Sequence, residues 1–170
     1  FEDRGNLLID MPGAMGGFFD EAFMQDCFVA LMAPEKRGKT WVLMELAFQA
    51  AQQGNNVMFF SVGDMSAAQI ERRWAIRTAE RPWEPKTIHV PTYLEIDGDD
   101  FQTGPEERVF DKALSKNASR KALKKAVPEG RVRLSCHPND SISAEGVQWE
   151  IQKYSLGGWV PNVVVIDYAD

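Results

Sequence analysis

The sequence predicts an α/β fold in which a mostly parallel sheet is flanked by helices. Short apolar runs alternate with helical stretches along the 170 residues, and this alternation is typical of parallel strands joined by right-handed crossovers. The composition, 44% hydrophobic and 26% charged, is close to that of an average globular protein, which excludes disordered and fibrous chains. No apolar run approaches the roughly 20 residues that a membrane-spanning helix needs, so we expect no membrane partner.

The most regular pattern lies in the first half of the chain. Cys27–Met32 is too apolar for a half-exposed strand and predicts a buried one. A helix is expected over 39–53, and a second buried strand over 57–62. A Ser-x-x-Gln capping box then opens a helix over 66–81.

The second half of the chain contains a charged insertion over 91–130. Its first part, up to Asp111, is acidic, whereas 112–127 has six basic residues and no acid. The basic part predicts a helix. The elements expected around the insertion are a short strand over 87–90, a strand over 131–136, a helix over 143–156 and a strand over 163–167.

These elements define a lead-in segment, 1–24, and one core domain, 25–170, which carries the insertion. The length is sufficient for one full hydrophobic core and too short for two ordinary domains. The chain begins without Met and ends just after a buried-type strand. We therefore expect it to be a piece of a longer protein, truncated after that strand.

A phosphate-binding loop is the main functional motif. Residues 33–40 match G-x-x-x-x-G-K-[ST] except for Ala33 at the first position. Backbone N–H groups of such a loop face a polyphosphate, Lys39 places a charge against the outer phosphates, and the Thr40 hydroxyl binds Mg²⁺. A chance match in a strand–loop–helix connection is the alternative. The candidate nucleotide-binding residues are Ala33, Pro34, Glu35, Lys36, Arg37, Gly38, Lys39, Thr40 and Trp41.

A second motif strengthens the prediction of a nucleotide site. Val163–Asp167 is four apolar residues followed by Asp at a strand end, which is the Walker B pattern. Its carboxylate would hold the Mg²⁺ shell beside Thr40. By itself, the pattern would favour a buried strand that ends in a helix-capping Asp.

Asp64 is the candidate catalytic residue. It follows the strand 57–62, and in a parallel sheet the carboxyl ends of strands lie at the edge where ligands bind. A carboxylate there could orient the water that attacks a phosphate. Alternatively, Asp64 only precedes a helix and favours its dipole.

These residues resemble the RecA-like ATPase domain of DnaB-type replicative helicases, including phage and plasmid relatives. In that family the phosphate loop often begins with Ala, and a Ser-x-Glu-Met-Ser-like segment follows the second strand. Here the segment is Ser61-Val62-Gly63-Asp64-Met65-Ser66, with one extra residue and Asp in place of Glu. The family's Walker B motif ends in Ile-Asp-Tyr, similar to residues 166–168. The resemblance covers roughly 25–77 and 135–170.

The resemblance implies binding of ATP and Mg²⁺, and hydrolysis at the subunit interfaces of a ring, usually a hexamer, that moves along single-stranded DNA. The family Glu is the hydrolytic base, so its role would pass to Asp64, whose shorter carboxylate reaches less far. The family's DNA-binding loops and trans-acting Arg lie beyond Walker B. Two other interpretations remain open: a recombinase-like or regulatory RecA-like ATPase, and a non-catalytic nucleotide-binding module.

The net charge and the cysteine content indicate which partners and which compartment the sequence fits. The net charge of −6 argues against a role in coating nucleic acid generally. Cys27 and Cys136 have neither disulfide nor metal-ligand spacing, which fits a reducing cytoplasm. His89 and His137 have no partners at metal spacing, and we interpret both as structural.

A weaker feature is the basic stretch 112–125. Lys112, Lys116, Arg120 and Lys124 are spaced by four and share one face of a helix. They could contact nucleic-acid phosphates. A solvated helix beside an acidic loop is the interpretation that the sequence favours.

Overall fold

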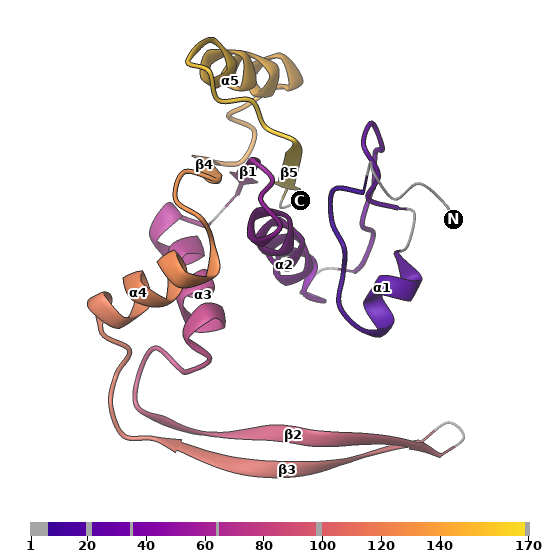
Figure 1. Cartoon of the computed structure of the whole chain (residues 1–170), viewed down its shortest axis with the longest axis vertical. Helices are drawn as coiled ribbons and strands as arrows, with labels where there is room; N and C mark the ends of the chain where they lie inside the picture. Colours follow the sequence, from indigo (N-terminus) through magenta and orange to yellow (C-terminus); the bar gives the residue numbers. More distant parts are fainter. Residues whose placement is uncertain (1–6, 20–21, 35, 64, 98–99, 169–170) are drawn as a thin grey trace. The chain divides into compact units, whose positions relative to one another are not determined.

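The computed structural model of the chain describes residues 7–19, 22–34, 36–63, 65–97 and 100–168. The chain divides into two compact units, Phe1–Trp74 with Lys124–Asp170, and Ala75–Leu123. The first unit contains a parallel sheet with its helices, and the second contains a β-hairpin (Figure 1). Among the described residues, no helix has the length and apolar character needed to cross a membrane.

A three-stranded parallel sheet forms the centre of the first unit. Its strands are β1 (Val57–Val62), β4 (Val132–His137) and β5 (Val163–Tyr168), in the order β4–β1–β5. Each strand lies within one residue of the range predicted from the sequence, and the predicted parallel pairing is confirmed. The α/β class with a parallel sheet flanked by helices is therefore correct.

Two helices cover one face of this sheet. They are α2 (Lys39–Gln52) and α3 (Ala67–Ala79), close to their predicted bounds. Trp74 of α3 packs edge-on against Phe59 of β1, with ring centroids 5.8 Å apart, and its indole N–H donates to the Met44 carbonyl of α2 at 3.2 Å. The core beneath these helices includes Met44, Leu46, Ala47, Phe48, Ala50, Ala51, Phe59 and Ile70.

The predicted capping box at the start of α3 is also confirmed. The Ser66 N–H donates to Gln69 Oε1 at 2.8 Å, and the Gln69 N–H donates to Ser66 Oγ at 3.4 Å. The two residues thus satisfy donors that the first turn of a helix leaves free.

Helix α5 (Ala144–Leu156) lies over the opposite face of the sheet (Figure 1). Ser143 caps it by accepting a hydrogen bond from the Gly146 N–H at 3.2 Å. Burial on both faces explains why every residue of the central strand β1 is buried and why all of them except Ser61 are apolar. The outer strand β5 is less covered on the α5 side, where Val164 and Ile166 are 41% and 49% exposed.

The strand predicted at Cys27–Met32 is wrong. This segment pairs with no strand in the described part of the chain, and Phe28 and Met32 are 93% and 94% exposed. A strand needs a neighbour for its N–H and C=O groups, and an apolar run does not by itself specify one. The preceding chain contains the short helix α1 (Ala14–Phe18) and a bridge between Leu7 and Met24, and Leu8 and Asp10 form hydrogen bonds with Asn55 and Gln53.

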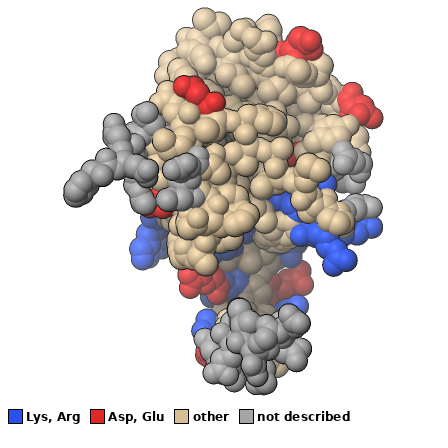
Figure 2. Space-filling model, turned by 90° about the vertical axis from the view of Figure 1, so that its right-hand side faces the viewer, with Lys and Arg blue, Asp and Glu red and all other residues tan. Residues whose placement is uncertain are grey.

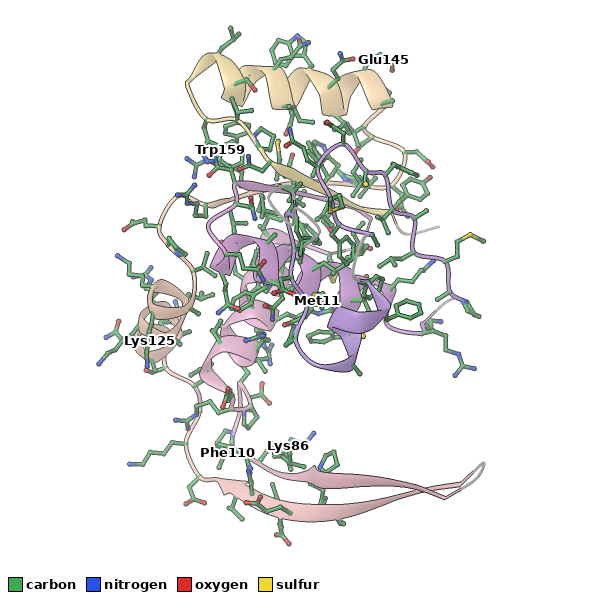
Figure 3. All side chains as sticks on the ribbon, turned by 45° about the vertical axis from the view of Figure 1, so that its right-hand side comes forward. Met11, Lys86, Phe110, Lys125, Glu145 and Trp159 are labelled. Carbon is green, nitrogen blue, oxygen red and sulfur yellow. The ribbon has the colours of Figure 1, made fainter. Side chains whose placement is uncertain are left out.

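The charged insertion differs from its prediction in part. Helix α4 (Lys116–Ala126) confirms the helical prediction for the basic part. The acidic part is not a loop, because β2 (Lys86–Asp97) and β3 (Asp100–Phe110) form an antiparallel hairpin. The short strand expected at 87–90 is the beginning of β2. Lys86 and Phe110, labelled in Figure 3, pair at the open end of this hairpin.

The base of the hairpin is anchored within the second unit. The Arg81 guanidinium lies 5.8 Å from the centroid of the Phe110 ring and donates to the Lys112 carbonyl at 2.6 Å. The Leu114 N–H donates to the Trp83 carbonyl at 3.0 Å, and Leu114 is buried. These contacts fix where the hairpin begins and ends, whereas a two-stranded hairpin alone is only marginally stable in water.

Candidate functional site

The predicted phosphate loop leads directly into the N-terminus of α2. Lys36 and Gly38 both have positive φ, 60° and 88°. Left-handed residues next to right-handed ones turn successive N–H groups toward one side and form the concave anion sites called nests. In the described part of the chain, no side chain caps the first turn of α2, so its free N–H groups are left for another acceptor.

The structure places the loop residues at the surface and the start of α2 partly inside. No heavy atom of the described chain lies within 4 Å of the position that a Cβ on Gly38 would take. Space for a ligand is therefore open beside this residue, and its φ of 88° is what requires glycine. Ala33, Pro34, Lys36 and Arg37 are exposed, Gly38, Lys39 and Thr40 are half-buried, and Glu35 lies outside the described residues.

Lys39 is half-buried, and no described carboxylate neutralises it. Within the described ranges, neither its ammonium nor the Thr40 hydroxyl has a side-chain or backbone partner. Burial of an unpaired ammonium is costly, so an anion at this position would be stabilising. Trp41, one residue further, instead stacks against Arg73 of α3, whose guanidinium lies 4.6 Å from the centre of the ring.

Asp167 is a buried carboxylate at the end of β5. It is 9% exposed, and no donor in the part of the chain that the structure describes bonds to its side chain. In register it lies beside Ser61 of β1, which in turn lies beside Cys136 of β4. The three side chains therefore form a row on the sheet face that α2 and α3 cover. Among the described residues its oxygens have no donor and are not sealed from solvent, so a ligand that the chain itself does not supply could reach them.

Cys136, the third residue of this row, has a shifted pKa. Burial, together with the negative charge of Glu71, raises the pKa of the Cys136 thiol above its ordinary value of 9.0. Both effects disfavour the thiolate. Cys136 is therefore a neutral neighbour in the row, not a reactive nucleophile.

Element lengths imply that the start of α2 and the end of β5 lie at the same edge of the sheet. Helix α2 contacts both β1 and β5 and is joined to β1 by residues 53–56. Its 14 residues span about 21 Å and the 6 residues of β1 about 20 Å. A helix that packs back along the next strand thus brings Lys39 toward the carboxyl ends of the strands, where Asp167 lies.

Asp64, the candidate catalytic residue, lies outside the described residues. In the described chain before it, β1 ends at Val62, and the Gly63 N–H donates to the His137 carbonyl at the end of β4, at 2.9 Å. The backbone before Asp64 is therefore fixed at the carboxyl edge. Gly63 itself has a φ of 151°.

The residues fit Mg²⁺ held together with a nucleotide better than a metal held by protein alone. Among the described residues, no group of three or more His, Cys, Asp and Glu side chains could hold a metal ion. Mg²⁺ commonly takes only one or two protein oxygens and completes its shell with phosphate and water. Thr40 and Asp167 would supply those two oxygens.

A polar cluster that the sequence analysis missed lies on the α5 face. The Ser135 hydroxyl donates to Glu150 Oε2 at 2.6 Å and lies 2.7 Å from His137 Nε2. Since the hydroxyl has a single proton, His137 Nε2 donates to it. Glu150 Oε1 lies 3.6 Å from the same nitrogen, so the carboxylate does not orient the other ring nitrogen as it would in a catalytic triad.

This cluster holds α5 on the sheet, which agrees with a structural role for His137. The alternation of Ser135 and His137 along one strand was the signal that could have placed them on one face.

Comparisons with protein-family models, with curated proteins and with solved structures found no match to the chain.

Proposed function

We propose that this chain is the nucleotide-binding part of a RecA-like P-loop NTPase that binds ATP with Mg²⁺. The proposal rests on two groups without described partners, which the lengths of α2 and β1 bring to the same edge of the sheet. Within the described part of the chain, Lys39 is a half-buried ammonium without an anion, and Asp167 is a buried carboxylate without a donor. A Mg²⁺–triphosphate would supply phosphate anions for the Lys39 ammonium and a cation for the Asp167 carboxylate.

Each residue of the site then has a role in binding. The backbone N–H groups of the loop and of the first turn of α2 bind phosphate oxygens, and Lys39 adds a charge against the outer phosphates. Thr40 and Asp167 hold the Mg²⁺ shell, which neutralises charge on the phosphates. Gly38 keeps the loop in its left-handed conformation and leaves room for the ligand.

Asp64 would orient the attacking water in hydrolysis. In sequence it follows β1 by two residues, and it matches the acidic position of the DnaB-like segment. In a longer protein that resembles DnaB-type helicases, hydrolysis would occur between subunits of a ring, usually a hexamer, acting on single-stranded DNA. A cytoplasmic location would fit that activity.

A non-catalytic nucleotide-binding module is the second candidate. Two observations favour it: the extra Gly63 before a shorter acid, and the lack of a paired strand ahead of the phosphate loop in the described ranges. In this case ATP–Mg²⁺ binds but is not hydrolysed. A recombinase-like or regulatory RecA-like ATPase would have the same site and differ in the region beyond Walker B.

Calorimetric titration with ATP–Mg²⁺ tests binding. We expect saturable heat for the native chain and little heat for Lys39→Ala. The control Lys86→Ala also removes one lysine, an exposed one on β2, and should bind as the native chain does. Equal binding by native and Lys39→Ala chains would refute the site. Hydrolysis by the longer protein, measured for Asp64→Asn, separates the two candidates, since an active native enzyme with an inactive variant identifies the ATPase.

A further inference from the structure

Helix α4 has a packed side and a basic side. Ser119 is buried, and Ala122, Leu123 and Ala126 are half-buried, so these residues form the packed side. The cations of the helix are all exposed and lie opposite them. We call the exposed set the α4 basic face: Lys116, Arg120, Lys121, Lys124 and Lys125. Figure 3 labels Lys125 on this helix, whose long side chains project outward.

The charges of this face are almost unneutralised. In the part of the chain that the structure describes, Lys124 alone of the five has an ion-pair partner, Glu129 at 3.8 Å, and both side chains are highly exposed. Such exposed pairs contribute little. Among the described residues, no ion pair joins this face to the acidic stretch before the helix.

The arrangement of these charges is unfavourable for an isolated helix. Lys116, Arg120 and Lys124 are spaced by four and repel one another, at about 0.2–0.5 kcal/mol per pair. The first turn contains no acid, and Lys116 lies at the end where the helix dipole disfavours a cation. An anionic partner along this face would remove both penalties.

We propose that the α4 basic face binds the phosphate backbone of nucleic acid without regard to base sequence. The helix rises about 1.5 Å per residue, so its five cations are spread over about 14 Å of its length and about half of its circumference, wide enough to contact several phosphates. This surface lies on a different element from the phosphate loop, and the proposal does not depend on ATP binding.

Other anionic partners fit this face less well. Helices that lie on membranes expose Trp, Phe or Leu beside their basic residues, but Leu114 is buried and Leu123 lies on the packed side. Protein interfaces obtain their affinity from buried aromatic and apolar residues and are depleted in Lys. The α4 basic face, described throughout, has no exposed large apolar residue, so its affinity must come from charge.

The overall charge of −6 does not oppose a local contact of this kind. On the face that Figure 2 displays, Lys and Arg form separate groups among uncharged and acidic residues, not one continuous basic field. Because such a contact would rest on charge, binding would depend strongly on salt.

Fluorescence anisotropy with a labelled 20-nucleotide oligo-dT tests the proposal, at several salt concentrations and without ATP. Five phosphate contacts predict a slope of log K against log[salt] of about −3.5. Arg120→Gln/Lys121→Gln should weaken binding about tenfold at low salt and reduce the steepness of the slope by about 0.7 for each cation removed. The control Lys86→Gln/Lys153→Gln removes the same charge from β2 and α5 and should bind as the native chain does.

Three outcomes would overturn the proposal: no binding at 50 mM salt, equal losses in the two double variants, or binding to anionic lipid vesicles but not to oligo-dT. Far-UV circular dichroism confirms that both variants keep their helices. Arg120→Gln/Lys121→Gln should leave calorimetric binding of ATP–Mg²⁺ unchanged, so failure of this proposal and failure of ATP binding are distinguishable. A mixed-sequence oligonucleotide should bind within about threefold of oligo-dT, because phosphate contacts carry no sequence information.

Discussion

Replacing Asp167 with Asn should make the protein more stable while impairing its proposed function. The carboxylate is 9% exposed, and no donor among the described residues bonds to it. A buried group of this kind typically costs about 1–3 kcal/mol, and more when it is charged. Asn has nearly the same shape without the charge. Because the side chain keeps some access to water, we expect a gain toward the lower end, about 1–2 kcal/mol.

Urea denaturation followed by tryptophan fluorescence measures this gain as a higher midpoint with an unchanged slope. For a chain of this size the melting temperature should rise by about 2–4 °C for each kcal/mol. The control is Asp111→Asn, at an exposed carboxylate, which should change stability by less than about 0.5 kcal/mol. A loss of stability in Asp167→Asn would mean that the carboxylate is a structural cap or a hydrogen-bonded group, and would refute the reasoning.

Three further predictions concern the loop, the core and the buried thiol. Gly38→Ala should lower the free energy of unfolding in urea by about 1–2 kcal/mol and weaken ATP binding. Alanine is strained at a φ of 88°, although no described atom of the chain obstructs its methyl group. Unchanged stability would show that the loop can rearrange. Phe59→Ala should cost about 3–5 kcal/mol in the same assay, since the ring is fully buried against Trp74, whereas a loss under about 1 kcal/mol would contradict the described packing. The raised pKa of Cys136 means that the folded state favours the protonated thiol, so this contribution to stability is present below about pH 9 and is lost as pH rises through the folded pKa. Alkylation followed by mass spectrometry should accordingly label the exposed Cys27 before Cys136, and faster labelling of Cys136 would be inconsistent with its burial.

The elements that the sequence predicts well are those whose local signals agree with their burial. Strand β1 is apolar throughout, apart from Ser61, because helices cover both faces of it, and its run of six residues is predicted from the sequence at the observed bounds. Helix α3 has a capping box at its start, and α5 has Ser143 at its N-cap. In each case the residue types themselves satisfy the backbone, so no knowledge of the tertiary structure is needed.

The segments that the sequence predicts poorly depend on contacts between distant residues. Cys27–Met32 is as apolar as β1, yet it has no partner strand among the described residues, and nothing in its composition could reveal this. Strand β3 contains Gly104, Pro105 and two adjacent acids, which locally favour a loop. It becomes a strand through pairing with β2.

The candidate site follows the same rule. The loop motif and the Asp at the end of β5 could be located from their patterns, but the absence of a described donor beside Asp167 could not. The Ser135–His137–Glu150 cluster was missed because it joins a strand to the helix after it, and such pairs depend on how the helix crosses the sheet.

The central claim is that Asp167 and the phosphate loop bind ATP and Mg²⁺ as one ligand. The most direct test is the affinity for ATP measured by calorimetry with excess Mg²⁺ and with excess EDTA, for the native chain and for Asp167→Asn. We predict that Mg²⁺ strengthens ATP binding to the native chain at least about tenfold (about 1.4 kcal/mol), and that Asp167→Asn loses this gain but keeps the affinity measured in EDTA. An equal gain from Mg²⁺ in both proteins, or no ATP binding by the native chain, would contradict the claim.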